Sequence, residues 1–64
     1  MRMNEIFKIN KYLDERFERA GTYLSNNCYL TISVNNKSVF GIATNKYTTA
    51  EKVIALFEEK IICQ

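Results

Sequence analysis

Hydrophobic residues near the N-terminus recur every three or four positions, the spacing that places them on one face of an α-helix. This first stripe consists of Ile6, Ile9, Leu13, Phe17 and Ala20. Asn4 is placed to cap the helix at its start, and Gly21 follows the stripe as a common stop signal. The pattern predicts a helix over about residues 4–20.

The middle of the chain changes to a period of two, which is typical of β-strands. Within residues 28–34, one side of the alternation holds Cys28, Leu30, Ile32 and Val34. Turn-forming residues stand at 25–27 and again at 35–37. We therefore expect strands at about residues 22–24, 28–34 and 38–44, or only the last two if residues 22–24 do not pair.

The length of the second turn decides which side chains share a face, because a shift of one residue reverses a strand. A two-residue loop would place Phe40 and Ile42 beside Tyr29. A three-residue loop would place them beside Leu30 and Ile32, which collects the large aliphatic side chains on one side and is the arrangement we favour. The other face would then be small and uncharged, formed by Tyr29, Thr31, Ser33, Val39, Gly41 and Ala43.

A second helical stripe closes the chain, with Ala50, Val53, Ile54, Phe57 and Ile61 at helical spacing. Thr48 and Glu51 have the spacing of a capping box, so this helix is expected over about residues 49–62. The order is then α-β-β-β-α (or α-β-β-α). It predicts one small α+β domain over residues 1–64, with two helices packed on one face of a small antiparallel sheet.

The composition removes several kinds of chemistry. The 64 residues include no histidine, which excludes an imidazole base, a histidine–zinc site and a serine–histidine triad. The acidic residues of the helices, such as Asp14, Glu15 and Glu18, fall on polar faces that are typical of solvated surface. We expect no catalytic residue, no metal site and no cofactor, and hence a protein that is not an enzyme.

The two cysteines, Cys28 and Cys63, lie far apart and form no CxxC pair. We interpret both as reduced, buried thiols, with a disulfide as the alternative. The first residues lack the apolar core of a signal peptide, and no run is apolar enough to cross a membrane. These features favour a cytoplasmic protein that does not associate with membranes.

Charge is distributed unevenly around a net value of +2, since residues 21–47 contain only Lys37 and Lys46 and no acid. Open sheet faces and edges are normally protected by charge or proline. We therefore expect the hairpin to be covered by a partner, although an exposed face without a role is the alternative. The expected protein-interaction residues are Tyr29, Thr31, Ser33, Asn35, Asn36, Lys37 and Val39.

Two further functions remain open. A small dimeric nucleic-acid-binding protein would use Lys37, Lys46, Tyr47 and Lys52, but the low net charge and the interleaved acids favour this less. A structural homodimerisation module, in which the sheets of two copies join or stack, is the other alternative.

Residues 30–36 (Leu-Thr-Ile-Ser-Val-Asn-Asn) and 51–57 (Glu-Lys-Val-Ile-Ala-Leu-Phe) resemble part of a family of small phage-encoded type II-A anti-CRISPR proteins. The likeness covers about residues 28–57. It implies a stoichiometric inhibitor that docks on a CRISPR effector nuclease in the cytoplasm of a bacterial host cell. The partner would then be a larger bacterial protein or nucleoprotein complex.

The predicted element order also resembles that of the double-stranded-RNA-binding domain. That family places a lysine cluster at the start of its last helix. Residues 45–52 correspond to this region and supply Lys46 and Lys52.

Overall fold

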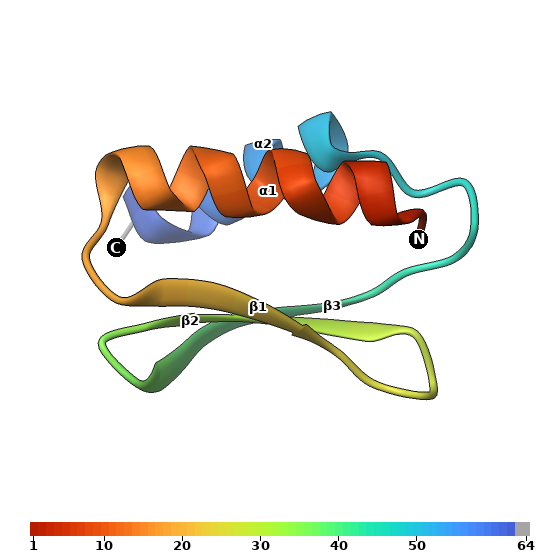
Figure 1. The fold of residues 1–64 in the computed structure, drawn as a ribbon, viewed down its shortest axis with the longest axis horizontal. Helices are drawn as coiled ribbons and strands as arrows, with labels where there is room; N and C mark the ends of the chain where they lie inside the picture. The colour runs from red at the N-terminus through yellow and green to blue at the C-terminus, as the bar shows by residue number, and fades with distance from the viewer. Residues whose placement is uncertain (63–64) are drawn as a thin grey trace.

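Both helices lie on the same side of a three-stranded antiparallel sheet in the computed structural model, which describes residues 1–62 (Figure 1). The elements are α1 (Met3–Arg16), β1 (Ala20–Leu24), β2 (Tyr29–Val34), β3 (Lys37–Ala43) and α2 (Ala50–Ile62). The predicted α+β class and the order α-β-β-β-α are confirmed. The order without a first strand is wrong, because residues 20–24 pair with β2.

The first helix ends four residues earlier than the hydrophobic stripe indicates. Phe17 is extended (φ −134°, ψ 150°) and Arg19 is left-handed (φ 53°), so β1 starts at Ala20. Phe17 and Ala20 still pack against the core from outside the helix, which is why the stripe continues past its end. Asn4 lies inside α1, and Arg2 occupies the N-cap position without a side-chain hydrogen bond.

The turn between β2 and β3 contains two residues, Asn35 and Asn36, both with positive φ (54° and 66°). Such a pair fits the type I′ turn of tight hairpins, in which asparagine is favoured because it tolerates this conformation. The predicted three-residue loop is therefore wrong.

A β-bulge in β3 places the following side chains on the same face of the sheet as a three-residue loop would have done. Ser33 pairs with Ser38 and Ile32 pairs with Phe40, so Val39 is the extra residue of β3. The insertion places Phe40 opposite Ile32 and Ile42 opposite Leu30. The prediction that these side chains share one face is confirmed, although the odd residue lies in the strand and not in the loop.

The last helix is capped by Thr49 and not by the predicted Thr48. The hydroxyl of Thr49 accepts a hydrogen bond from the amide of Lys52 at 3.3 Å. Thr48 instead accepts a bond from the amide of Asn45 at 2.9 Å within the preceding loop. A carboxylate from α1 completes this end of α2, because Glu5 Oε1 accepts the Ala50 amide at 2.8 Å.

The core lies between the helical layer and the sheet. Phe57 of α2 is at its centre, with edge-to-face contacts to Tyr12, Phe17 and Phe40 at centroid distances of 6.3, 5.8 and 5.8 Å. The buried residues are Ile9, Leu13, Leu30, Ile32, Phe40, Ala50, Val53 and Phe57.

Cys28 is exposed, and the prediction of a buried thiol on the core face is wrong. The residue belongs to the turn before β2 and has a positive φ of 61°, so the strand's alternation does not extend to it. Its carbonyl accepts hydrogen bonds from the amide and hydroxyl of Thr44 at 2.8 and 2.6 Å. The prediction for Cys63 falls outside the described residues.

Candidate functional site

The side of the sheet that faces away from the helices is open to solvent. Cross-strand pairing aligns Tyr23, Thr31 and Gly41 in one row across the three strands. A second row consists of Gly21, Ser33 and Ser38, and Tyr29 pairs with Ala43. We call this surface the outer face, formed by Gly21, Tyr23, Tyr29, Thr31, Ser33, Ser38, Gly41 and Ala43.

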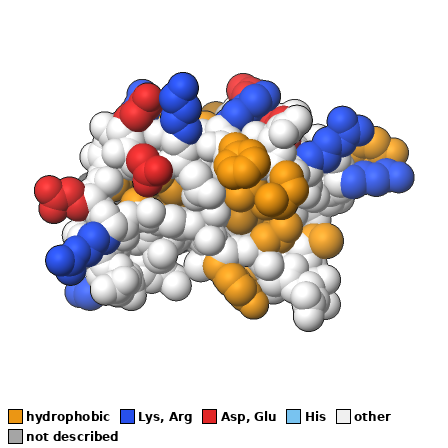
Figure 2. Space-filling model, in the orientation of Figure 1, with side chains coloured by type: hydrophobic (Ala, Val, Ile, Leu, Met, Phe, Trp, Pro, Cys, Tyr) orange, Lys and Arg blue, Asp and Glu red, His pale blue; other side chains and the backbone are white. Residues whose placement is uncertain are grey.

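The outer face carries no charged residue, and its largest side chains are two exposed tyrosines. Tyr23 is 68% exposed and Tyr29 is 48% exposed. Figure 2 views the molecule along the sheet, with most of the red and blue side chains on the helical layer and at the two ends. The strands present mainly uncharged atoms in this view.

The ring of Tyr29 lies across Gly41 of the neighbouring strand. A Cβ atom at Gly41 would stand 2.5–2.9 Å from the Tyr29 ring and hydroxyl, closer than side chains approach one another. A methyl group at position 41 would therefore push the end of the Tyr29 ring away from its present position. A shallow hollow of about 320 Å³ adjoins this contact, with Thr31, Ser38 and the Lys60 side chain of α2 among its lining residues.

The structure brings most of the expected interaction residues together. Tyr29, Thr31 and Ser33 lie on the outer face, Asn35 and Asn36 form the turn at its end, and Lys37 opens β3. Val39 differs from the expectation, because as the bulge residue it is half-buried and packs against the core, although it also borders the hollow.

Tyr23 belongs to the same surface, and sequence reasoning missed it. The predicted helix extended to residue 20, so only residues 22–24 were expected to be a strand, and no face was assigned to them. The alternation of Thr22, Tyr23 and Leu24 with their partners on β2 carries the signal. Tyr23 can be assigned to the outer face from this alternation only when β1 is known to begin at Ala20.

The residues of the nucleic-acid alternative do not form one surface. Lys37 lies at the β2–β3 turn, whereas Lys46 and Tyr47 lie in the loop after β3, at the opposite end of the sheet (Figure 1). The length of β3 separates them by roughly 20 Å. Lys52 is exposed in the first turn of α2.

Lys46 and Tyr47 nevertheless form a local pair, with the ammonium group 5.1 Å from the ring centroid. Together with Arg2 and the two threonines that precede α2 they border a small hollow of about 190 Å³, which Glu5 also lines. The carboxylate makes this hollow less suited to an anion. The amide of Ala50, bonded to that carboxylate, lowers the pKa of Glu5 from its ordinary 4.5, so it is charged at neutral pH.

Tyr12 is the second titratable group with a perturbed pKa, and it lies away from the outer face. Its hydroxyl donates a hydrogen bond of 2.6 Å to Glu58 Oε2, which joins α1 to α2. Burial, and then this bond to a carboxylate, raise the pKa of Tyr12 to about 12. The group is therefore a neutral interhelical donor.

The described residues hold no cluster of three acidic or thiol side chains that could ligate a metal ion. Within residues 1–62, neither helix has the length and apolar character needed to cross a membrane.

Fold and site together define a class: a small two-layer α+β protein whose helices cover one side of a sheet and whose other side is an uncharged, tyrosine-bearing surface. Comparisons with protein-family models, with curated proteins and with solved structures returned no match to this chain. The class therefore rests on the geometry alone, and neither resemblance noted in the sequence gains support from these comparisons.

Proposed function

We propose that this protein is a non-enzymatic binding protein that docks on a larger protein through its outer face. The observation that carries the proposal is the open, uncharged sheet surface with Tyr23 and Tyr29 exposed on neighbouring strands. Exposed aromatic side chains supply large contact area with few rotatable bonds, which is why tyrosine is enriched at binding hot spots.

Charge favours a protein partner over nucleic acid. Binding to a phosphate backbone requires several cations close together, and its strength falls steeply with salt. The outer face contributes no cation of its own, and Lys37 and Lys46 lie at opposite ends of β3. A flat surface of hydroxyls and aromatic rings suits an equally uncharged patch on a folded protein.

A 64-residue chain that covers part of a larger protein acts most simply by blocking that surface. We accordingly propose a stoichiometric inhibitor or modulator, with a larger bacterial protein or nucleoprotein complex in the cytoplasm as its target. The resemblance to the type II-A anti-CRISPR family, and with it a phage or mobile-element origin, makes a CRISPR effector nuclease the first target to test.

The experiment is a pull-down from a bacterial lysate and, separately, a binding test with the purified CRISPR effector. Each is done with and without prior nuclease treatment, which removes DNA and RNA from the sample. The two outer-face variants are Tyr23→Ser and Thr31→Glu. Tyr47→Ser is the matched control, because Tyr47 is also an exposed tyrosine (75%) but lies in the loop after β3. The presence of a captured protein does not by itself support the proposal. Each band is judged by whether it is lost with the outer-face variants and kept with the control variant.

We expect a stoichiometric protein band that survives nuclease treatment, disappears with Thr31→Glu, weakens with Tyr23→Ser and remains with Tyr47→Ser. Binding that survives both outer-face variants would show that the surface is wrong. Binding that vanishes with nuclease and with Tyr47→Ser would favour the nucleic-acid alternative instead.

A further inference from the structure

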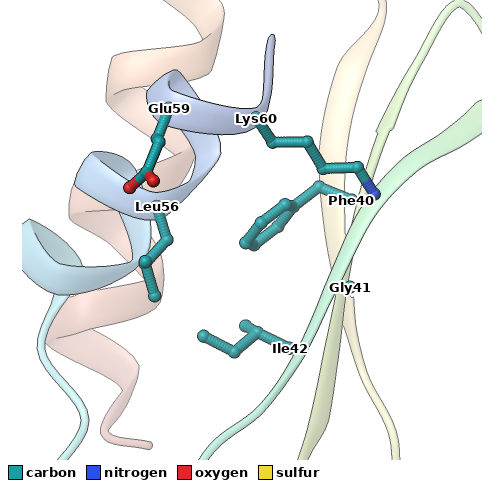
Figure 3. Close-up of a pocket in the computed structure, with 6 residues that line it drawn as sticks. All are labelled: Phe40, Gly41, Ile42, Leu56, Glu59 and Lys60. Atoms are coloured by element: carbon teal, nitrogen blue, oxygen red, sulfur yellow. The ribbon is translucent and has the colours of Figure 1, made fainter. Parts of the chain in front are cut away.

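The side chain of Lys60 extends from α2 across the outer edge of β3. Its ammonium group lies 5.8 Å from the centroid of the Phe40 ring. Figure 3 shows the side chain passing over Phe40, with its nitrogen beside β3. Lys60, Phe40 and Gly41 line both the groove of about 420 Å³ between α2 and β3 and the shallow hollow of the outer face. The lysine therefore lies at the border between the helical side of the sheet and its outer face.

β3 is an end strand of the sheet, and its own sequence leaves this edge unprotected. Residues 38–43 contain no charged side chain and no proline, the residues that normally discourage another chain from pairing with an edge. The bulge at Val39 lies near the start of the strand, and residues 40–43 pair regularly with β2. Protection of residues 40–43 must therefore come from another element.

The backbone groups that are free at this edge lie beside Lys60. The Thr44 amide bonds to the Cys28 carbonyl, and hydrogen-bonded pairs alternate along an antiparallel ladder. Phe40 therefore bonds to β2, whereas Gly41 directs its amide and carbonyl toward the free edge. A strand added there would lie about 4.7–4.9 Å from β3, in the space that the Lys60 side chain crosses.

We propose that Lys60 protects the β3 edge against pairing with another chain. An added strand would have to displace the lysine or bury its charge, and burial of an unpaired ammonium group is strongly unfavourable. The methylene groups of the side chain cover the edge at Phe40 while the charge remains in water. The helix thus supplies the charge that the strand lacks. This inference goes beyond the proposed function and does not rest on it, since the outer face is a different surface.

The test measures self-association of Lys60→Ala by sedimentation equilibrium from micromolar to millimolar concentration. The wild type should remain at the 7.5 kDa of the single chain. Lys60→Ala should form dimers or larger species in the same range, at least about tenfold more strongly than the wild type, because the edge is then open. Lys60 is exposed, so circular dichroism should show nearly unchanged helical content.

Three further variants separate the charge from the rest of the side chain. Lys60→Arg keeps a long cationic side chain and should remain monomeric. Lys52→Ala, the matched control, removes an equal charge from the first turn of the same helix and should also remain monomeric. Lys60→Gln keeps methylene groups over Phe40 and removes the charge. It should self-associate, and it tests the proposal even if Lys60→Ala does not fold.

Amide hydrogen exchange identifies the edge. In Lys60→Ala, the amides of Gly41 and Ala43 should exchange more slowly as the concentration rises, whereas those of β1, the other end strand, should not change. If both Lys60→Ala and Lys60→Gln stay monomeric at every concentration, the proposal is overturned. Association of the wild type through β3, equal association of Lys52→Ala, or protection of β1 in place of β3 would overturn it as well.

Discussion

Tyr29 and Gly41 are in close contact on neighbouring strands of the outer face. The end of the aromatic ring occupies the space that a side chain at position 41 would need. Gly21, the other glycine of the outer face, has nothing within 4 Å of the position of a Cβ atom. Neither glycine has a positive φ, so both can be replaced by alanine without backbone strain.

This contrast predicts that replacing glycine by alanine has different effects on stability at the two sites. Gly21→Ala should raise the free energy of unfolding by about 0.5 kcal/mol, because alanine restricts the unfolded chain more than glycine does. Gly41→Ala should give no such gain, since its methyl group displaces the Tyr29 ring. Urea unfolding measures the first effect, and the NMR shifts of the Tyr29 ring report the second. Equal stabilisation by both variants, with an unmoved ring, would contradict the close contact.

Tyr12 provides a prediction about pH. Tyr12→Phe removes the hydrogen bond to Glu58 and should lower the free energy of unfolding by about 1 kcal/mol at pH 7. The folded protein raises the pKa of Tyr12 from 10 to about 12, so it favours the protonated phenol. The difference in free energy of unfolding between the wild type and Tyr12→Phe should therefore be largest below pH 10 and be lost as the pH rises toward 12. Urea unfolding of both proteins between pH 7 and pH 11 measures this difference, and an advantage that stays constant would count against the assignment.

Among the elements, α2 begins with help from α1, because the Glu5 carboxylate accepts the Ala50 amide. The negative charge of the carboxylate interacts favourably with the positive end of the helix dipole. The protonated, neutral form of Glu5 lacks this interaction. Because the pKa of Glu5 is lowered from 4.5, its contribution is present above that pH and is lost as the pH falls through the lowered value.

The corresponding prediction compares the wild type with Glu5→Gln. The variant should melt at a lower temperature at pH 7, and the gap should close as the pH falls below 4.5. Thermal melts followed by circular dichroism at pH 3, 5 and 7 test this. Replacing the nearby exposed Asn4 by glutamine is the control, since Asn4 makes no cap and should change the melting temperature little.

The hairpin of β2 and β3 depends on the turn formed by Asn35 and Asn36. Valine cannot adopt the positive φ of 66° at position 36 without a steric conflict between its Cβ and the backbone. Asn36→Val should therefore destabilise the protein by about 1–2 kcal/mol, while Asn36→Gly should be at least as stable as the wild type. Urea unfolding distinguishes them, and equal stability of the valine variant would mean that the turn is longer than two residues.

Among the helices and strands, the sequence predicts best those in which hydrophobic residues recur at regular spacing without interruption. The stripes of the two helices and the alternation of residues 30–34 predict these elements and the faces that they bury. Ends are harder to predict, because Phe17 and Ala20 continue the helical spacing from outside the helix. The bulge at Val39 could not be predicted from the sequence. A bulge in the strand and an extra residue in the loop place the later side chains of the strand on the same face, so the hydrophobic pattern does not distinguish them.

For the whole molecule, Phe57 is the side chain that joins the layers, with aromatic contacts to both α1 and β3. Phe57→Ala should lower the free energy of unfolding by about 3–5 kcal/mol. A domain of this size has only several kcal/mol in total, so this variant should be largely unfolded at 37 °C. Phe57→Leu, which keeps most of the volume, should remain folded with a loss of about 1–2 kcal/mol. Thermal melts test both, and a folded alanine variant would show that the core is held elsewhere.

The candidate site could be predicted in part. Its lack of charge and the alternation of Tyr29, Thr31 and Ser33 can be read from one hairpin. Tyr23 could not be assigned to it, because its place depends on where α1 ends and on which strand pairs with β2. The groove of about 420 Å³ between α2 and β3, which Phe40, Ile42 and Leu56 line (Figure 3), could not be predicted either, since it depends on how α2 lies over the sheet.

The division of the sheet into two sides has a consequence for how this protein can change over evolution. No residue of the outer face belongs to the buried core, while β2 alternates strictly between the two sides. Most substitutions on the outer face therefore leave stability within about 0.5 kcal/mol, outside the Tyr29–Gly41 contact. The fold can therefore accept many different outer-face residues at nearly constant stability, so substitutions can accumulate there while the core stays the same.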